Sequence, residues 1–196
     1  MALSQVQVVN LALTKLGQDR VTSISDDVEQ ARVMRSLWDM TRDAVLASYP
    51  WKFAIVSAEL PALADAPTAS DWTLQYELPE TCLRLVQVGN SSAFYSRSTE
   101  TFSLQGGLIL TDEPAPLRVR YVSRVESVGL WPVLFGRAVA MQLACDAAEK
   151  LTNSSAKYEN CLQAFVIAIR EARRQNAIER PPQGVDDSDW LSARDD

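Results

Sequence analysis

The chain has 196 residues, 47% of them hydrophobic and 22% charged, with a net charge of −6 and no histidine. This composition predicts one sizeable folded core, and no apolar run approaches the roughly 20 residues that cross a bilayer. The lack of histidine excludes Ser-His-Asp and Cys-His catalysis and His-ligated zinc, and the acidic balance argues against broad nucleic-acid binding.

The sequence shows no sign of secretion or of a disulfide framework. The first residues lack the basic start and apolar stretch of a signal peptide, so we expect the protein to stay in the cytosol of its producing cell. Three cysteines, Cys82, Cys145 and Cys161, are too scattered for a disulfide framework and too few for a Cys₄ zinc site. We interpret them as small buried side chains.

The first predicted helix covers about residues 4–16. Its apolar residues recur at three- and four-residue steps, Ser4 and Gln7 are spaced for a capping box, and Gly17 stands where a helix usually stops.

A second, longer helix is predicted over about residues 26–48. Asp26 places negative charge at its positive end, and Tyr49-Pro50 ends it. One stripe should face the core, and its members are Ala31, Met34, Trp38, Thr41, Val45 and Ser48.

The middle of the chain reads as β structure. Residues 57–71, rich in Pro, Ala and Asp, are predicted to be a linker, and residues 72–125 to be an inserted antiparallel β module in which apolar residues alternate with polar ones. Gln105-Gly106-Gly107 is predicted to be a hairpin turn. The expected strands cover about residues 72–78, 83–88, 94–95 (the weakest), 101–104, 108–111 and 117–121.

Helical periodicity returns in the last third. An Ala-rich helix with few charges is predicted over residues 133–151 and a final helix over residues 155–179. The sequence thus predicts an α+β fold: a mainly helical bundle formed by residues 1–56 and 130–180, an inserted small antiparallel β module, and an extended C-terminal tail over residues 181–196.

Few residues suggest chemistry. The sequence contains no phosphate-binding glycine loop and no CxxC pair, so no cofactor and no metal is expected. Asp39 and Asp43, with Glu29 on the same helix, are the one carboxylate set considered for glycosidic hydrolysis, and a solvated face with ion pairs to Arg35 and Arg42 is the favoured interpretation. The arginine groups, Arg118, Arg120 and Arg124 and then Arg170, Arg173 and Arg174, are interpreted as solvated or inter-subunit surfaces.

One arrangement covers nearly the whole chain. Thr14-Lys15-Leu16-Gly17 ends the first helix, Tyr49-Pro50-Trp51-Lys52-Phe53-Ala54 follows the second, Tyr76-Glu77-Leu78-Pro79 opens the β region, and Leu143-Ala144 lies on the Ala-rich helix. This arrangement resembles the head-to-tail adaptor, or connector, proteins of tailed bacteriophages, the group that includes the tail tubular protein A and tail accessory factors. Its most specific part is residues 49–54.

The resemblance implies a structural virion protein with no catalytic residues. Family members form twelve-fold rings under the portal that extend the DNA channel and give the next tail (nozzle or tube) protein a platform. DNA would pass during ejection without specific binding, and a subunit alone could be a monomer. The C-terminal tail would reach into the portal, through Val185, Trp190, Leu191 and Arg194.

A different class of function stays open. Some tail accessory proteins are associated with cell-wall hydrolysis, so a peptidoglycan hydrolase that uses Asp39 with Asp43 or Glu29 is the alternative. A turbidity assay on purified cell wall distinguishes this hydrolase from the adaptor.

Overall fold

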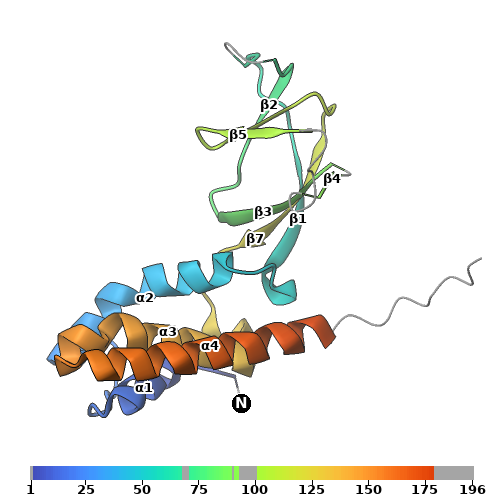
Figure 1. Cartoon of the computed structure of the whole chain (residues 1–196). Coiled ribbons are helices and arrows are strands. Elements are labelled where there is room, and N and C mark those ends of the chain that lie inside the picture. The colour runs from blue at the N-terminus through green and yellow to red at the C-terminus, as the bar shows by residue number, and fades with distance from the viewer. Residues whose placement is uncertain (1, 68–70, 90, 93–100, 179–196) are drawn as a thin grey trace, which may run out of the picture.

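The computed structural model describes residues 2–67, 71–89, 91–92 and 101–178. It is an α+β fold in which a helical bundle carries an inserted β module, as the sequence predicts (Figure 1). The helices are α1 (Gln5–Leu16), α2 (Glu29–Ala47), α3 (Val133–Thr152) and α4 (Ser155–Ile178), with 3₁₀ turns η1 (Lys52–Ala54) and η2 (Val128–Leu130). The strands are β1 (Ile55–Leu60), β2 (Leu74–Glu77), β3 (Cys82–Val88), β4 (Ser91–Ser92), β5 (Ser103–Gln105), β6 (Leu108–Thr111) and β7 (Leu117–Ser123).

Helix α1 begins and ends as predicted. The Ser4 hydroxyl accepts from the Gln7 amide at 3.3 Å, and the Gln7 side chain accepts from the Ser4 amide at 2.9 Å. Gly17 ends the helix at φ 74°, a left-handed conformation that glycine adopts without steric cost.

Helix α2 begins three residues later than predicted, after Val28, which makes no side-chain cap. The Asp26 carboxylate instead accepts hydrogen bonds from the Thr22 and Ser23 amides, at 2.8 and 2.9 Å, and from the Thr22 hydroxyl. These donors, the Ser23 amide foremost, lower the pKa of the Asp26 carboxyl. Asp26 therefore closes a turn before the helix. The predicted stripe is buried from Ala31 to Val45, but Ser48 at its end is exposed.

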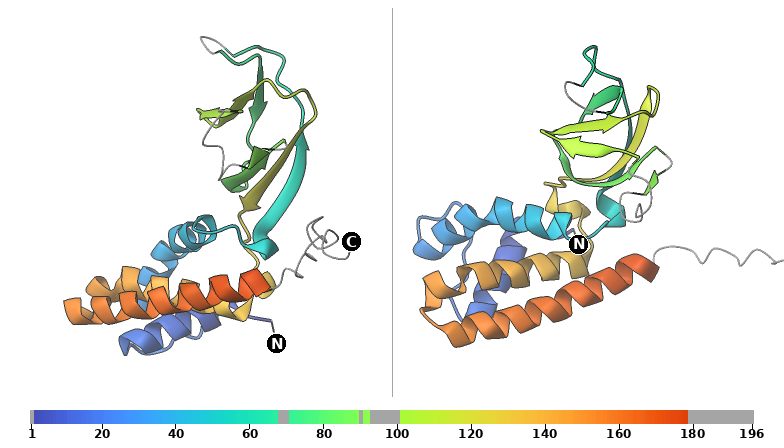
Figure 2. Two further views of the ribbon diagram at one scale, coloured as in Figure 1. Left: turned by 45° about the vertical axis from the view of Figure 1, so that its right-hand side comes forward. Right: turned by 45° about the horizontal axis from the view of Figure 1, so that its top comes forward.

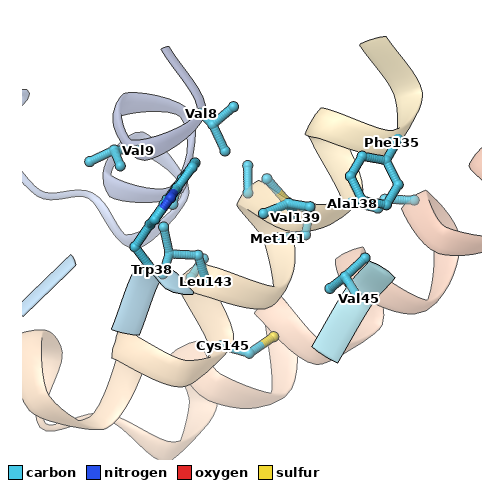
Figure 3. Close-up of a cluster of buried hydrophobic side chains, with 14 of the residues drawn as sticks. Val8, Val9, Trp38, Val45, Phe135, Ala138, Val139, Met141, Leu143 and Cys145 are labelled. Carbon is cyan, nitrogen blue, oxygen red and sulfur yellow. The ribbon is translucent and has the colours of Figure 1, made fainter. Parts of the chain in front are cut away.

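Helix α3 is the centre of the bundle and packs against α1, α2 and α4. Its small side chains let the neighbouring helices approach closely, which is the packing that its Ala-rich sequence predicts. Val8 and Val9 of α1 and Trp38 of α2 meet α3 in this core (Figure 3). Among the described residues, no helix has the length and hydropathy that a membrane span requires.

The β module stands beyond one end of α2 and has a small core of its own (Figures 1 and 2). One antiparallel sheet has the strand order β1-β7-β3-β4 and the other the order β2-β6-β5. Tyr76 and Ile109 are fully buried between them. The predicted hairpin joins β5 and β6, with Gly106 at φ 59° and Gly107 at φ 81°.

The predicted linker over residues 57–71 is wrong at its start. Strand β1 runs through residue 60 and pairs along its whole length with β7, from Ile55 opposite Val122 to Leu60 opposite Leu117. Apolar and polar residues alternate only weakly in β1 and strongly in β7, so β1 becomes a strand because it pairs with β7 and not because of its own pattern. The predicted strand at Phe94-Tyr95 and the predicted tail over residues 181–196 lie outside the described residues.

Candidate functional site

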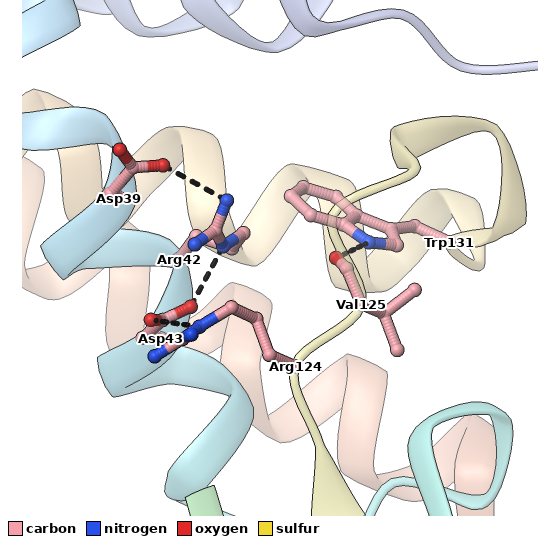
Figure 4. Close-up of polar contacts among 6 residues, drawn as sticks. All are labelled: Asp39, Arg42, Asp43, Arg124, Val125 and Trp131. Carbon is pink, nitrogen blue, oxygen red and sulfur yellow. Dashed lines mark hydrogen bonds and ion pairs between the residues drawn. The ribbon is translucent and has the colours of Figure 1, made fainter. Parts of the chain in front are cut away.

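The most elaborate polar cluster joins the bundle to the β module. Arg42 of α2 has only 7% of its side chain exposed, so the predicted solvated position is wrong for this residue. Its Nη1 lies 2.9 Å from Asp39 Oδ1, and its Nε lies 2.7 Å from Asp43 Oδ1. Figure 4 shows Arg42 between α2 and the segment that carries Val125 and Trp131, which explains its burial.

Asp43 also binds the β module. Its Oδ2 accepts from Nε of Arg124 at 2.8 Å, and Arg124 directly follows β7 (Figure 4). From β3, Arg84 Nη1 donates to the Ala47 carbonyl at the end of α2 at 3.2 Å. Charge-assisted bonds are stronger than neutral ones, so these contacts fix where the β module sits on α2.

Aromatic rings surround the same joint. Trp131 stacks on Trp38, with ring centroids 5.9 Å apart and planes 13° apart, and its Nε1 donates to the Val125 carbonyl. Trp51 is 1% exposed and meets the edge of Phe135 at 5.0 Å. Residues 49–54, the most specific part of the resemblance, therefore turn the chain from α2 into β1, with Trp51 and Ala54 buried in the core and Tyr49 and Phe53 packed against it.

The helix geometry separates the proposed hydrolase carboxylates. Glu29 lies ten residues before Asp39, about 15 Å along the helix axis at 1.5 Å per residue, which exceeds the roughly 5–10 Å of a glycosidase pair. Glu29 lies instead 3.6 Å from Lys150 Nζ. Asp39 and Asp43 do lie together, but Arg42 pairs with both. This arrangement favours the ion-pair interpretation.

The two predicted arginine groups have different surroundings. Arg118 and Arg120 share the outer face of β7, whereas Arg124 turns to Asp43, so the three do not form one row. On α4, Arg173 lies over the Tyr49 ring, 5.3 Å from its centroid, a cation–π contact that the sequence did not indicate.

Helix α4 carries exposed apolar side chains beside its packed face. Tyr158, Leu162 and Val166 follow at four-residue steps and are 40%, 42% and 44% exposed. Such spacing puts them in one line along the helix. Ile167 is 53% exposed and, five positions after Leu162, lies well away from that line.

The three cysteines are free thiols, with Cys145 and Cys161 buried as expected and Cys82 partly exposed. Burial raises the pKa of all three, that of Cys145 to about 12. Among the described residues, no group of acidic or cysteine side chains could hold a metal ion.

The predicted portal-binding residues, Val185, Trp190, Leu191 and Arg194, lie outside the described residues. Compared with known proteins, the chain matches no family model, and no curated protein is significantly similar to it.

Proposed function

We propose that the protein is a structural head-to-tail adaptor of a tailed bacteriophage. Its subunits would form a ring, twelve-fold as in the resembled family, that binds under the portal, extends the DNA channel and gives the next tail protein a platform. It would be assembled in the host cytoplasm and end at the head–tail interface of the virion. The proposal includes no catalytic turnover.

The observation that supports it most is the apolar line on α4. Tyr158, Leu162 and Val166 extend the packed face of the helix onto the surface, where exposed apolar groups that lie together favour association. In this proposal the line contacts the next subunit of the ring.

The size of this line suggests when the ring forms. A stable interface buries about 800 Å² on each partner, which three half-exposed side chains do not supply. Isolated subunits are therefore expected to be monomers, and the ring is expected on a preformed portal, where two weak contacts act together.

The charge of the chain suits a DNA channel. A net charge of −6 disfavours binding to the phosphate backbone, so DNA can move past without being held. Passage of DNA is passive in this proposal.

The second contact is the C-terminal tail in the portal. Trp190 and Leu191 are large apolar side chains in an otherwise polar segment, as expected of an anchoring peptide. Val185 and Arg194 would lie beside them in the same portal contact.

Co-sedimentation with the portal oligomer encoded in the same genome tests this role. The Trp190→Ala/Leu191→Ala variant should lose portal binding at least about tenfold, because aromatic anchors dominate interfaces. Ser188→Ala/Ser192→Ala is the matched control and should bind as the wild type does. Equal binding by both variants would remove the tail from the proposal.

A further inference from the structure

A hollow of about 460 Å³ lies on the outer face of the β1-β7-β3 sheet, away from the α2 joint. Its principal lining residues are Ser57, Glu59, Gln87, Gly89, Arg118 and Arg120. In register, Ser57 lies opposite Arg120 and Glu59 lies opposite Arg118, so one arginine has a carboxylate beside it and the other has a hydroxyl.

Arg118 and Arg120 accordingly differ in their side-chain partners. Arg118 Nε lies 3.0 Å from Glu59 Oε1, and the Glu113 carboxyl lies against Gly89 at that end of the hollow. Arg120 has only a long contact of 3.4 Å from Nη1 to the Gln87 amide oxygen in the described part of the chain. A guanidinium has five N–H donors, so Arg120 is the position that an added carboxylate would satisfy.

The end of α4 lies near the base of this sheet. The Lys52 amide donates to Asn176 Oδ1 at 2.9 Å, and Lys52 Nζ reaches the Ala177 carbonyl at 3.4 Å. Lys52 is five residues before Ser57, at most about 17 Å of extended chain. The described end of α4 therefore lies near the 3₁₀ turn η1, which leads directly into β1, the strand that forms one wall of the hollow.

That continuing chain is acidic and long enough. Residues 183–196 contain five aspartates and one arginine. Asp186 is eight residues beyond Ile178, a reach of up to about 26 Å. Lys52, a positive charge, lies beside the end of α4, where the tail begins. Along β1 from Lys52, Ser57 opposite Arg120 comes before Glu59, so an acidic tail arriving from α4 reaches Arg120 before it meets that carboxylate.

We propose that the acidic C-terminal tail of the same chain docks on this hollow, with Asp186 and Asp187 at Arg120. The inference does not rest on the adaptor role. If the adaptor role and the docking both hold, the tail stays bound to its own β module until it binds the portal. Portal binding then leaves the hollow empty.

Backbone NMR relaxation of the ¹⁵N-labelled full chain tests the docking. In the wild type, amides 184–191 should have order parameters above roughly 0.6, the range of ordered backbone. Arg120→Glu should lower them well below that value and shift these amides toward random-coil positions, as should raising the salt to about 0.5 M, which screens the ion pairs.

Matched variants distinguish loss of the Arg120 charge from unfolding of the protein. Arg32→Glu makes the same charge change on α2, where Arg32 pairs with Asp27 at 3.5 Å, and should leave the tail ordered. Unchanged amide shifts in β2 and β6, which share the core of the β module, and in α1–α4 would show that Arg120→Glu folds. Arg120→Gln serves if it does not. Adding Asp186→Arg/Asp187→Arg to Arg120→Glu should restore the order.

Three results overturn the proposal. A wild-type tail with order parameters below about 0.6 throughout would show that it does not dock. Order that appears only as protein concentration rises would make a second copy the occupant, and a tail equally ordered in wild type and Arg120→Glu would place it elsewhere. None of these results bears on portal binding, which co-sedimentation measures separately.

Discussion

Asp43 accepts from Arg124 at 2.8 Å while its other oxygen pairs with the buried Arg42, so one carboxylate ties α2 to the strand that leaves the β module. The chain crosses between bundle and module twice, through residues 48–54 and 124–132. Asp43 links α2 to the second of these crossings and, with the bond from Arg84 to the Ala47 carbonyl, sets the orientation of the module on α2.

Removing Asp43 should destabilise the fold. Asp43→Ala leaves Arg42, with 7% of its side chain exposed, only the outer carboxylate Asp39. Breaking a buried pair costs about 3–5 kcal/mol and an exposed pair about 0–1 kcal/mol, so we expect a loss of about 2 kcal/mol in the free energy of unfolding by urea titration.

Asp39→Ala is the control, because the Asp39 side chain is 77% exposed, and it should cost less than about 1 kcal/mol. In a double-mutant cycle, Asp43 and Arg124 should couple by about 1 kcal/mol. A coupling of zero would show that this ion pair does not hold the module.

The capping box of α1 should contribute measurably. Ser4→Ala removes the acceptor of the Gln7 amide and should lower the free energy of unfolding by about 1 kcal/mol. Ser36→Ala, in the exposed middle of α2, should change it by less than about 0.5 kcal/mol. Equal effects in thermal unfolding would mean that the α1 cap is not formed in solution.

Alkaline pH should weaken the fold through Cys145. Its pKa rises from 9.0 to about 12 on burial, so above pH 9 the unfolded thiol loses its proton while the folded thiol keeps it. The stabilisation is complete below pH 9 and is lost as pH rises toward 12, by up to about 1.4 kcal/mol per pH unit.

Cys145→Ala should therefore show a flatter decline of unfolding free energy between pH 9 and 10.5 than the wild type. Urea titrations at several pH values measure this slope. Parallel curves for the two proteins would contradict a buried, protonated thiol at this position.

The α4 line should matter for assembly and not for folding. Leu162→Glu/Val166→Glu changes side chains that are 42% and 44% exposed, so the monomer should unfold within about 0.5 kcal/mol of the wild type. The same variant should fail to form a ring on the portal. Ile167→Glu, off this line, should form the ring as the wild type does.

The sequence predicts most of the fold because its local signals agree with the final packing. The capping box at Ser4, the Ala-rich α3 and the glycine hairpin at Gly106 each need only neighbouring residues to be recognised. The sequence does not reveal strand β1, because its identity depends on pairing with β7, whose residues follow 57 to 67 positions later. It misplaces Asp26 as a helix-terminal charge, because the Asp26 carboxylate binds the turn before it.

The candidate site was less predictable for a related reason. Arg42 and Asp43 read as a solvated helix face, and only the return of the chain at Arg124 buries them. The hollow at Arg120 likewise depends on three strands whose register the sequence does not specify. The spacing of apolar residues, every 3.6 residues in a helix or every second residue in a strand, describes one element at a time and does not show which distant segments meet.

Electron microscopy of the purified protein mixed with the portal oligomer from the same genome tests the adaptor role most directly. The account predicts an added ring of density beneath the portal, absent with Leu162→Glu/Val166→Glu and present with Ile167→Glu. A bare portal beside free wild-type protein would contradict it. In that case clearing of purified cell wall, lost in Asp39→Asn, would be the next measurement.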